Sequence, residues 1–298
     1  MQRYIFFLFL MSAAVTVSGG KELPPPVNTQ PATFCRFVPE RADDFAWEND
    51  LIAFRAYGPA ICKSKGREDS GVDVWLKRVN YPILDRWYAL DKQGFPYHRD
   101  FGEGNAPYHT GRSRGCGGTA LWKDGKLILP GPYKDWKIIS REPQKSVFEL
   151  TYAYDLDGAK IQEIKRITIE LGKRLFLSES TFTKEGKPVA GLEIAVGITT
   201  HDGKAKGTLN QAKGWISCWE TIEKSGVGTG VVLAPSRVVE MRDLKSPVKD
   251  ESHLLVVTRT DAEGKTVHYA GYGWQKAGEI TTPEKWEACL DRFADALK

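Results

Sequence analysis

The amino-acid sequence predicts a mainly β fold, a large antiparallel sandwich or barrel. Apolar and polar residues alternate in many short segments, turn residues separate neighbouring segments, and helical periodicity is limited to two stretches. So many strands in one unit favour a sandwich or barrel architecture. The chain has 298 residues, and since all-β domains of roughly 250 residues are common, we expect a single domain.

The predicted strands run from residue 51 to residue 274. They cover residues 51–58, 146–156, 159–171, 174–183, 191–199, 228–235, 252–260 and 266–274. Asp157-Gly158 and Gly172-Lys173 separate consecutive strands, which is typical of antiparallel hairpins, and Asp261 to Gly264 joins the last pair.

Two segments have helical spacing. Between Pro82 and Leu90, four apolar residues share one helical face. The C-terminal segment offers Thr282 as the N-cap and Pro283 as the first helical residue. Its apolar stripe contains Trp286, Cys289, Leu290, Phe293 and Leu297. We therefore expect an amphipathic helix over about 283–297 that packs on the sheet, with Cys289 as a buried, inert thiol.

The N-terminus has the pattern of a signal peptide. Arg3 precedes an apolar run from Tyr4 to Val17, and small residues follow at 18–20. The run is shorter than the about 20 residues of a membrane span, so stable membrane insertion after signal removal is not expected. We predict a signal peptide at 1–20, a proline-rich spacer at 21–33, a single domain at 34–298, and a secreted, periplasmic location.

Composition excludes several classes of partner and cofactor. The 42 basic and 38 acidic residues give a net charge of +4 and are mixed along the chain, without the basic stripe of a nucleic-acid-binding protein. The five cysteines form no CxxC pair, so neither a structural zinc site nor another metal site is expected, while one disulfide remains open. The glycine-rich stretches lack the GK[ST] ending of a phosphate loop, and no GxSxG elbow is present; no cofactor is predicted.

Residues 96–118, PYHRDFGEGNAPYHTGRSRGCGG, contain the highest density of side chains suited to catalysis or ligand binding. Glycines let the backbone approach a ligand, while histidine, carboxylate, tyrosine and arginine supply proton-transfer groups and fixed charge. The candidates are His98, Glu103, Tyr108, His109, Arg112 and Arg114. The alternative is a long, solvated connection held by internal hydrogen bonds. The length and aromatic content of residues 96–118 favour a functional loop over this alternative.

Other candidates lie outside this segment. In residues 36–55, Trp47 and Glu48 are candidates for one end of a sugar cleft, although a capped turn with its charges in water explains most of these acids. Trp219 and Trp274 are candidate sugar platforms, or core residues. His201 ends a predicted strand, where a sheet commonly offers a side chain to a cleft; an exposed turn histidine is the alternative. We interpret His253 and His268 as structural.

Three stretches resemble the signature regions of a family in the galactose-mutarotase-like superfamily, from about Phe34 to the C-terminus. They are RFVPERADDFAWENDLIAFRAYGPA, YHRDFGEGNAPYHTGRSRGCGG and YAGYGWQKAG. The family includes an ulvan oligosaccharide dehydratase, which eliminates water from a non-reducing-end uronic acid and leaves a 4,5-unsaturated sugar. The resemblance implies an antiparallel supersandwich with a concave sugar-binding face and an oligosaccharide substrate. The chain departs from the family pattern at Asp100-Phe101-Gly102, where the family has histidine before glycine.

That elimination needs a cation on the carboxylate, a base for the proton at C5 and an acid for the hydroxyl at C4. Arg112 or Arg114 can hold the carboxylate, and His98, Tyr108 and His109 can share the proton transfers. Two alternatives stay open. A mutarotase-type epimerase would use His98 or His201 with Glu103 or Glu220, and a non-catalytic carbohydrate-binding protein would use the tryptophans.

Overall fold

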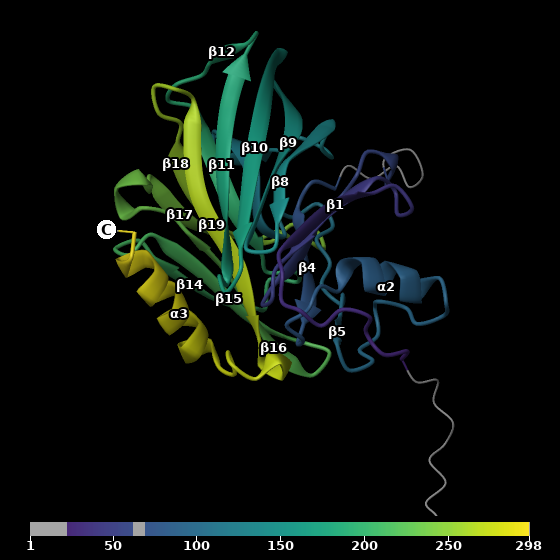
Figure 1. Ribbon diagram of the computed structural model, residues 1–298. Coiled ribbons are helices and arrows are strands. Elements are labelled where there is room, and N and C mark those ends of the chain that lie inside the picture. The colour runs from purple at the N-terminus through teal and green to yellow at the C-terminus, as the bar shows by residue number, and fades with distance from the viewer. Residues whose placement is uncertain (1–22, 62–68, 298) are drawn as a thin grey trace, which may run out of the picture.

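The computed structural model describes residues 23–61 and 69–297 and confirms the mainly β prediction (Figure 1). Strands account for 48% of the described residues and helices for 11%. The predicted signal peptide at 1–20 lies outside the described residues. None of the described helices has the length and apolar character needed to cross a membrane.

Three antiparallel sheets build the molecule. The first has the order β1 (Phe34–Val38), β2 (Asp44–Glu48), β3 (Ala53–Ala56), β4 (Val72–Lys77) and β5 (Gly104–Asn105). The second, the large sheet, has the order β14 (Lys206–Asn210), β15 (Trp215–Ile222), β16 (Ser225–Val232), β19 (Lys265–Trp274), β11 (Leu175–Lys184), β10 (Ala159–Glu170), β9 (Lys145–Leu156) and β8 (Asp135–Glu142), with β12 (Lys187–Pro188) beside β11. The third has the order β17 (Glu240–Leu244), β18 (His253–Arg259), β13 (Glu193–Thr199), β6 (Cys116–Lys123) and β7 (Lys126–Ile128).

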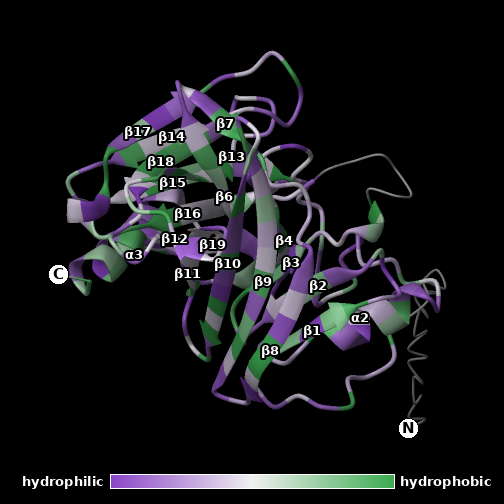
Figure 2. Cartoon of the chain, turned by 90° about the horizontal axis from the view of Figure 1, so that it is seen from above, coloured by the Kyte–Doolittle hydropathy of each residue, from purple (hydrophilic) through white to green (hydrophobic). Residues whose placement is uncertain are grey.

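The period-two pattern explains how the large sheet packs. In β9 and β10, buried and exposed residues alternate, as the change of colour along the long strands illustrates (Figure 2). Phe148, Leu150 and Ile167 point inward and join one hydrophobic cluster with residues of the other two sheets, such as Trp47 and Val196. Each such side chain contributes about 1.5–3 kcal/mol by leaving water. The core therefore lies between the sheets.

The last long strand, β19, lies inside the large sheet. It pairs with β11 on one side, where Leu175 is opposite Gly271, and with β16 on the other, where Val227 is opposite Trp274. β11 and β16 are not neighbours, so β19 joins the two halves of this sheet.

Both predicted helices are confirmed, and they lie on opposite sides of the molecule (Figure 1). α2 (Leu84–Asp91) packs beside the first sheet, and α3 (Pro283–Asp295) packs on β15 and β16. Glycines on β16 make room for α3, because a Cβ at Gly230 would lie 2.8 Å from the Leu290 side chain. Short 3₁₀ turns, η1 (Pro235–Arg237) and η2 (Gln275–Ala277), complete the elements.

In residues 36–55, Glu40, Asp43 and Asp50 lie in turns or bends that are at least partly open to water, as the charges suggested, whereas Asp44 and Glu48 lie on a buried strand. The segment forms most of the β1–β2 hairpin and of β3, in which Phe37 pairs with Phe45 and Phe45 with Ala56. All five residues of β2 are buried, so its acids do not face water. The four cysteines among the described residues are free thiols. The fifth cysteine, Cys62, lies outside the described residues.

Replacing Thr282 by alanine is expected to lower the free energy of unfolding by about 1 kcal/mol. The Thr282 side chain caps α3 by accepting a hydrogen bond from the backbone N–H of Lys285. Urea denaturation monitored by tryptophan fluorescence measures the change. Thr281→Ala is the control because Thr281 precedes the cap, and equal effects of the two substitutions would contradict the capping role.

Candidate functional site

Four segments bring ionisable side chains together beside the end of β13. His201 follows β13, Glu220 lies on β15, Tyr108 and His109 precede β6, and Asp250 lies between β17 and β18. His201 has a left-handed backbone with φ of 48°, which is uncommon for a residue with a side chain and often marks a functional position. We call this group the histidine cluster.

The His201 ring is held from both sides. Its Nδ1 lies 2.7 Å from Oε2 of Glu220, and its Nε2 lies 2.8 Å from the carbonyl oxygen of His109. A carboxylate and a carbonyl accept hydrogen bonds, so both partners favour hydrogen on the ring nitrogens and therefore the imidazolium form. Burial lowers the pKa of His201, but the hydrogen bond and charge of Glu220 outweigh it and the net pKa is raised. His201 therefore occupies a mostly buried position whose surroundings favour its charged, acid form.

His109 has the opposite character. Burial and the neighbouring charge of His201 lower its pKa, although Asp250 acts in the other direction. The His109 and His201 ring centroids are 4.9 Å apart, and Nδ1 of His109 lies 3.3 Å from Oδ1 of Asp250. The His109 side chain is 52% exposed, so a substrate can reach it. A neutral, accessible imidazole beside an imidazolium is a candidate base next to a candidate acid.

Tyr108 packs beneath these histidines. Its ring contacts the His201 ring edge-on, with centroids 4.8 Å apart. The hydroxyl is buried and makes no hydrogen bond within the described part of the chain. Burial, with Cys116 and Glu220 nearby, raises the pKa of Tyr108 well above its usual value, so the phenol stays protonated at neutral pH.

Two consecutive acids connect the histidine cluster to Arg112. Asp250 faces His109, and Oε1 of Glu251 lies 3.2 Å from Nε of Arg112. The Arg112 side chain is 62% exposed, so its guanidinium remains open to an anion. Gly111 permits this close approach, because a Cβ there would lie 2.6 Å from Cβ of Asp250.

Arg114, the other candidate for binding a carboxylate, is a core residue. It is fully buried, and its guanidinium donates to the carbonyl of Thr119 and to Ser70, at 3.0 and 3.1 Å. Burial lowers its pKa to about 10. The structure thus separates the two arginines, and Arg112 alone of the pair reaches the surface.

Two of the three tryptophan candidates are packed inside the protein, and the third is partly exposed. Trp47 is 1% exposed and stacks on Phe54, and Trp274 is 2% exposed in the same hydrophobic cluster. Trp219 is partly exposed and packs against the cluster beneath α3 that contains Trp286. The rings of Trp47 and Trp274 stabilise the core, so their positions do not support a sugar-binding role, whereas the role of Trp219 as a sugar platform stays a prediction.

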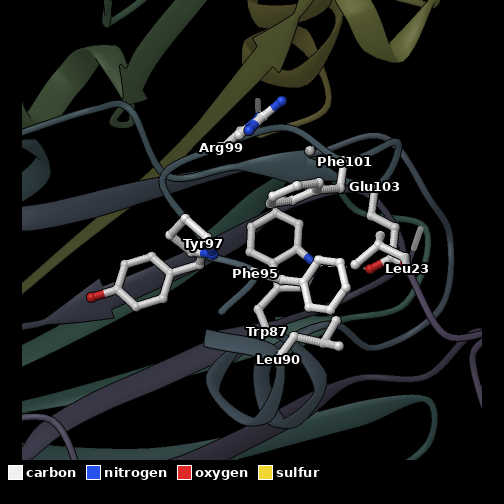
Figure 3. Close-up of a pocket in the computed structure, with 10 residues that line it drawn as sticks. Leu23, Trp87, Leu90, Phe95, Tyr97, Arg99, Phe101 and Glu103 are labelled. Carbon is white, nitrogen blue, oxygen red and sulfur yellow. Dashed lines mark hydrogen bonds between the residues drawn. The ribbon is translucent and has the colours of Figure 1, made fainter. Parts of the chain in front are cut away.

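Glu48 and Glu103 have structural partners. Glu48 is fully buried, with Oε2 at 2.8 Å from Nζ of Lys77. Glu103 lies near Trp87 of α2 (Figure 3) and accepts a hydrogen bond from its indole at 3.0 Å. It also accepts a hydrogen bond from Arg86. The prediction that Glu103 shares one cleft with His201 is therefore not supported.

His98 lies at the surface and contacts residues of its own segment, 96–118. Its Nδ1 is 2.8 Å from the carbonyl oxygen of Ala106, and its ring contacts Tyr97. The contacts of His98 thus differ from those of His109, which joins the histidine cluster.

Sequence reasoning missed Asp250 and a second polar cluster that is enclosed between the sheets. Asp250 lies in an irregular segment with no period to mark it. In the enclosed cluster, Glu163 accepts from the hydroxyls of Tyr154 and Ser180, both at 2.6 Å, and Lys165 donates to Thr119 at 2.8 Å. The sequence did contain a signal for the enclosed cluster, because Glu163 and Lys165 occupy inward positions of β10 between Ile161 and Ile167. The described residues include no group of three His, Cys, Asp or Glu side chains placed to hold a metal ion.

Comparison with known proteins gives a family and a relative. The sequence profile of a family described as "Domain of unknown function (DUF4861)" matches residues 14–298. A relative from Formosa agariphila, "Uncharacterized protein P7", is 36% identical over 293 residues, which are 95% of this chain and 71% of the relative.

Two solved structures overlap this fold in part. The α-galactosidase from Lactobacillus brevis has a TM-score of 0.38 at 9% identity, and the match covers 84% of this chain and 42% of that enzyme. The GH36 α-galactosidase AgaB from Geobacillus stearothermophilus has a TM-score of 0.39 at 10% identity, and the match covers 86% of this chain and 43% of that enzyme. The chain spans less than half the length of either enzyme.

Proposed function

This chain belongs to the DUF4861 family, and we propose that it is a hydro-lyase that eliminates water from the terminal uronic acid of an oligosaccharide. The residues of the histidine cluster, together with the sequence resemblance to a family that contains an ulvan oligosaccharide dehydratase, support this reaction. The signal-peptide pattern supports a periplasmic location, where polysaccharide fragments arrive.

One observation carries the proposal. His201 and His109 lie side by side, and their surroundings move their pKa values in opposite directions. At neutral pH the pair therefore offers an imidazolium acid and a neutral imidazole base. An elimination that removes a proton and releases a hydroxyl needs both groups at once.

The reaction follows from these protonation states. His109 takes the proton from C5, the electron pair of that C–H bond forms the C4–C5 double bond, and the C4–O bond breaks. The proton that His201 shares with the carbonyl of His109 goes to the departing hydroxyl, which leaves as water. Arg112 holds the uronate carboxylate and stabilises the negative charge that develops when the C5 proton leaves. A proton then returns from His109 to His201, which restores the starting state.

Incubation of the purified chain with saturated oligosaccharides that end in a uronic acid tests the proposal. The expected result is a product that absorbs in the far ultraviolet, and Arg112→Lys should lower the rate because a lysine keeps the charge but loses the planar fork. Faster anomer exchange of a free sugar without such a product would favour the epimerase. Binding without either change would favour a carbohydrate-binding protein.

The elimination rate is expected to form a bell-shaped curve against pH. The acidic limb reflects protonation of His109, whose pKa lies below the ordinary histidine value, and the alkaline limb reflects deprotonation of His201, whose pKa lies above it. Replacing Glu220 by glutamine removes the charge that raises the pKa of His201, so the alkaline limb should move to lower pH.

Histidine ring NMR across the same pH range provides a readout that does not depend on activity. The ring titrating at the higher pH should be lost in His201→Asn and shifted downward in Glu220→Gln. An unmoved alkaline limb in Glu220→Gln would show that His201 is not the acid.

A further inference from the structure

Two pockets lie on the outer face of the large sheet, where β19 and β11 extend beyond α3 (Figure 1). One has a volume of about 330 Å³ and is bordered by Leu177 and Phe293, and the other has a volume of about 360 Å³ and is bordered by Val267 and Leu297. Both volumes lie in the range that is usual for ligand sites. Tyr269 lines both pockets, so they are neighbours with its ring between them. We call the pair the Tyr269 groove.

The period of two along β19 turns Tyr269 outward. Lys265, Val267 and Tyr269 are exposed or partly exposed, whereas the residues between them are buried. On the neighbouring strand, Leu177 lies opposite Tyr269. The Phe293 ring of α3 contacts the Tyr269 ring edge-on, with centroids 4.8 Å apart, and so fixes its orientation. A partly exposed, fixed aromatic ring is a suitable platform for the apolar face of a sugar ring.

The Tyr269 groove is separate from the histidine cluster. Trp219 and Glu220 are consecutive residues of β15, and their side chains therefore point to opposite faces of the large sheet. Trp219 packs against the cluster beneath α3 on the outer face, so Glu220 and its partner His201 lie on the inner side. One sugar ring cannot occupy both places, which makes the groove a second site.

The groove has more positive than negative charge. Its ionisable lining residues are Lys145, Lys173, Glu170, Arg237, Lys265 and Asp261. Both carboxylates have partners: Glu170 lies 3.3 Å from Lys145, and Asp261 accepts a hydrogen bond from the backbone N–H of Lys265 at 2.8 Å. The ammonium groups of Lys173 and Lys265 are exposed and form no ion pair within the described residues. One unpaired ammonium therefore remains on each side of Tyr269.

The spacing of these two lysines requires an extended ligand. Lys265 lies four residues before Tyr269 on β19, a distance of about 14 Å along the strand. Lys173 lies in the other direction, because it precedes Leu175, which is opposite Gly271. A single sugar is too short to contact the ring and both ammonium groups. A chain with an anionic group on several of its units is complementary to all three.

We propose that the Tyr269 groove binds the interior of an acidic polysaccharide, away from the chain end that reacts. Tyr269 stacks on one sugar ring, and Lys173 and Lys265 contact carboxylates or sulfate esters on units to either side. The choice of a polysaccharide rests on the proposed function, whereas the preference for repeated negative charge rests on the lining residues. Such a site would hold the enzyme on the polymer that supplies its oligosaccharides.

Affinity electrophoresis of the full chain in native gels tests this site with polygalacturonate, dextran sulfate and neutral dextran. At least one of the two anionic polymers should slow the protein relative to a polymer-free gel, and dextran should not. The dependence of mobility on polymer concentration gives the Kd. Binding requires no reaction, so this measurement is independent of the elimination.

Charge reversal separates the groove from general attraction between polyanions and a protein of net charge +4. Lys265→Glu should weaken binding by about three- to tenfold. Lys92→Glu, the same change at the exposed end of α2 on the opposite side of the molecule (Figure 1), should weaken it less than twofold. Because both substitutions change the net charge equally, only the location of the lysine differs between them.

Two substitutions of Tyr269 test the platform. Tyr269→Ala removes the ring and should weaken binding by about three- to tenfold, whereas Tyr269→Phe keeps the ring and should retain most of it. Neither residue belongs to the histidine cluster, so Tyr269→Phe and Lys265→Glu should convert short oligosaccharides at the wild-type rate.

Retardation by dextran sulfate alone identifies a sulfate ester as the preferred group, and retardation by polygalacturonate alone identifies a carboxylate. The proposal is overturned if dextran slows the protein as strongly as the anionic polymers, if Lys265→Glu binds as Lys92→Glu does, or if Tyr269→Ala binds as the wild type. Groove-dependent retardation without an unsaturated product from any oligosaccharide would reject the dehydratase and keep the groove. The unsaturated product without such retardation would do the reverse.

Discussion

Replacing His109 by alanine is expected to lower the rate of elimination by about 10²- to 10⁴-fold, with little change in KM. His109 is the neutral, half-exposed imidazole beside the His201 imidazolium, and a group that moves a proton acts mainly in the transition state. Its carbonyl, which accepts from His201, stays in place in the alanine variant. The loss should therefore report the missing base and not a collapsed site. Formation of the ultraviolet-absorbing product under saturating substrate measures it.

His98→Ala is the matched control for this experiment. His98 lies in the same segment, and sequence alone made it an equal candidate for the base, but its ring contacts Ala106 and Tyr97. We expect it to retain most of the activity. Loss of activity in His98→Ala with retention in His109→Ala would move the base to His98 and reject the present assignment.

Replacing Glu48 by alanine is expected to lower the free energy of unfolding by about 3–5 kcal/mol, since it leaves a buried ammonium without its counter-ion. Glu48 and Lys77 have fully buried side chains, 2.8 Å apart. The same carboxylate accepts from the backbone N–H groups of Ile83 and Leu84, and so satisfies the first donors of α2 in place of a local cap. Urea denaturation measures the loss.

A double variant separates the ion pair from the packing around it. Glu48→Leu with Lys77→Met removes both charges and keeps the volume, so it should recover part of the stability that Glu48→Ala loses. Asp50→Ala, two residues away and partly exposed, removes the hydrogen bond that the Asp50 carboxylate accepts from the backbone N–H of Gly172 and should cost only about 1 kcal/mol. A loss below 1 kcal/mol in Glu48→Ala would mean that water reaches the pair.

The sequence revealed strands that either alternate or form apolar runs, and missed short strands interrupted by charges. β9, β10 and β11 alternate, and β16 and β18 are apolar runs buried at nearly every position, so all five were found, whereas β2 (DFAWE) and β4 (VDVWLK) contain charged residues and show no period of two although they are fully buried. β2 also begins and ends with an acidic residue, so its sequence resembles a charged surface segment although the strand is part of the core.

For the site, the sequence identified side chains with suitable chemistry, but it did not show which of them are buried in the folded protein. Tyr108, His109 and His201 were selected for their proton-transfer groups, and the fold brings them together. Arg114 and Trp47 have equally suitable chemistry, yet they lie in the core, because a side chain's distance from the surface depends on pairings made far along the chain. Asp250 approaches His109 only through the packing of the segment between β17 and β18 against Gly111.

The position of β19 sets the order in which the chain can fold. Residues 265–274 form the strand between β11 and β16, so during synthesis the two halves of the large sheet keep unpaired edges until residue 274 has emerged. Such edges are templates for pairing with other chains, and contacts between residues roughly 100 positions apart, such as Leu175 with Gly271, form slowly. A nascent chain of this protein is therefore most prone to aggregate just before β19 emerges, and a chain cut before residue 265 would keep both edges open.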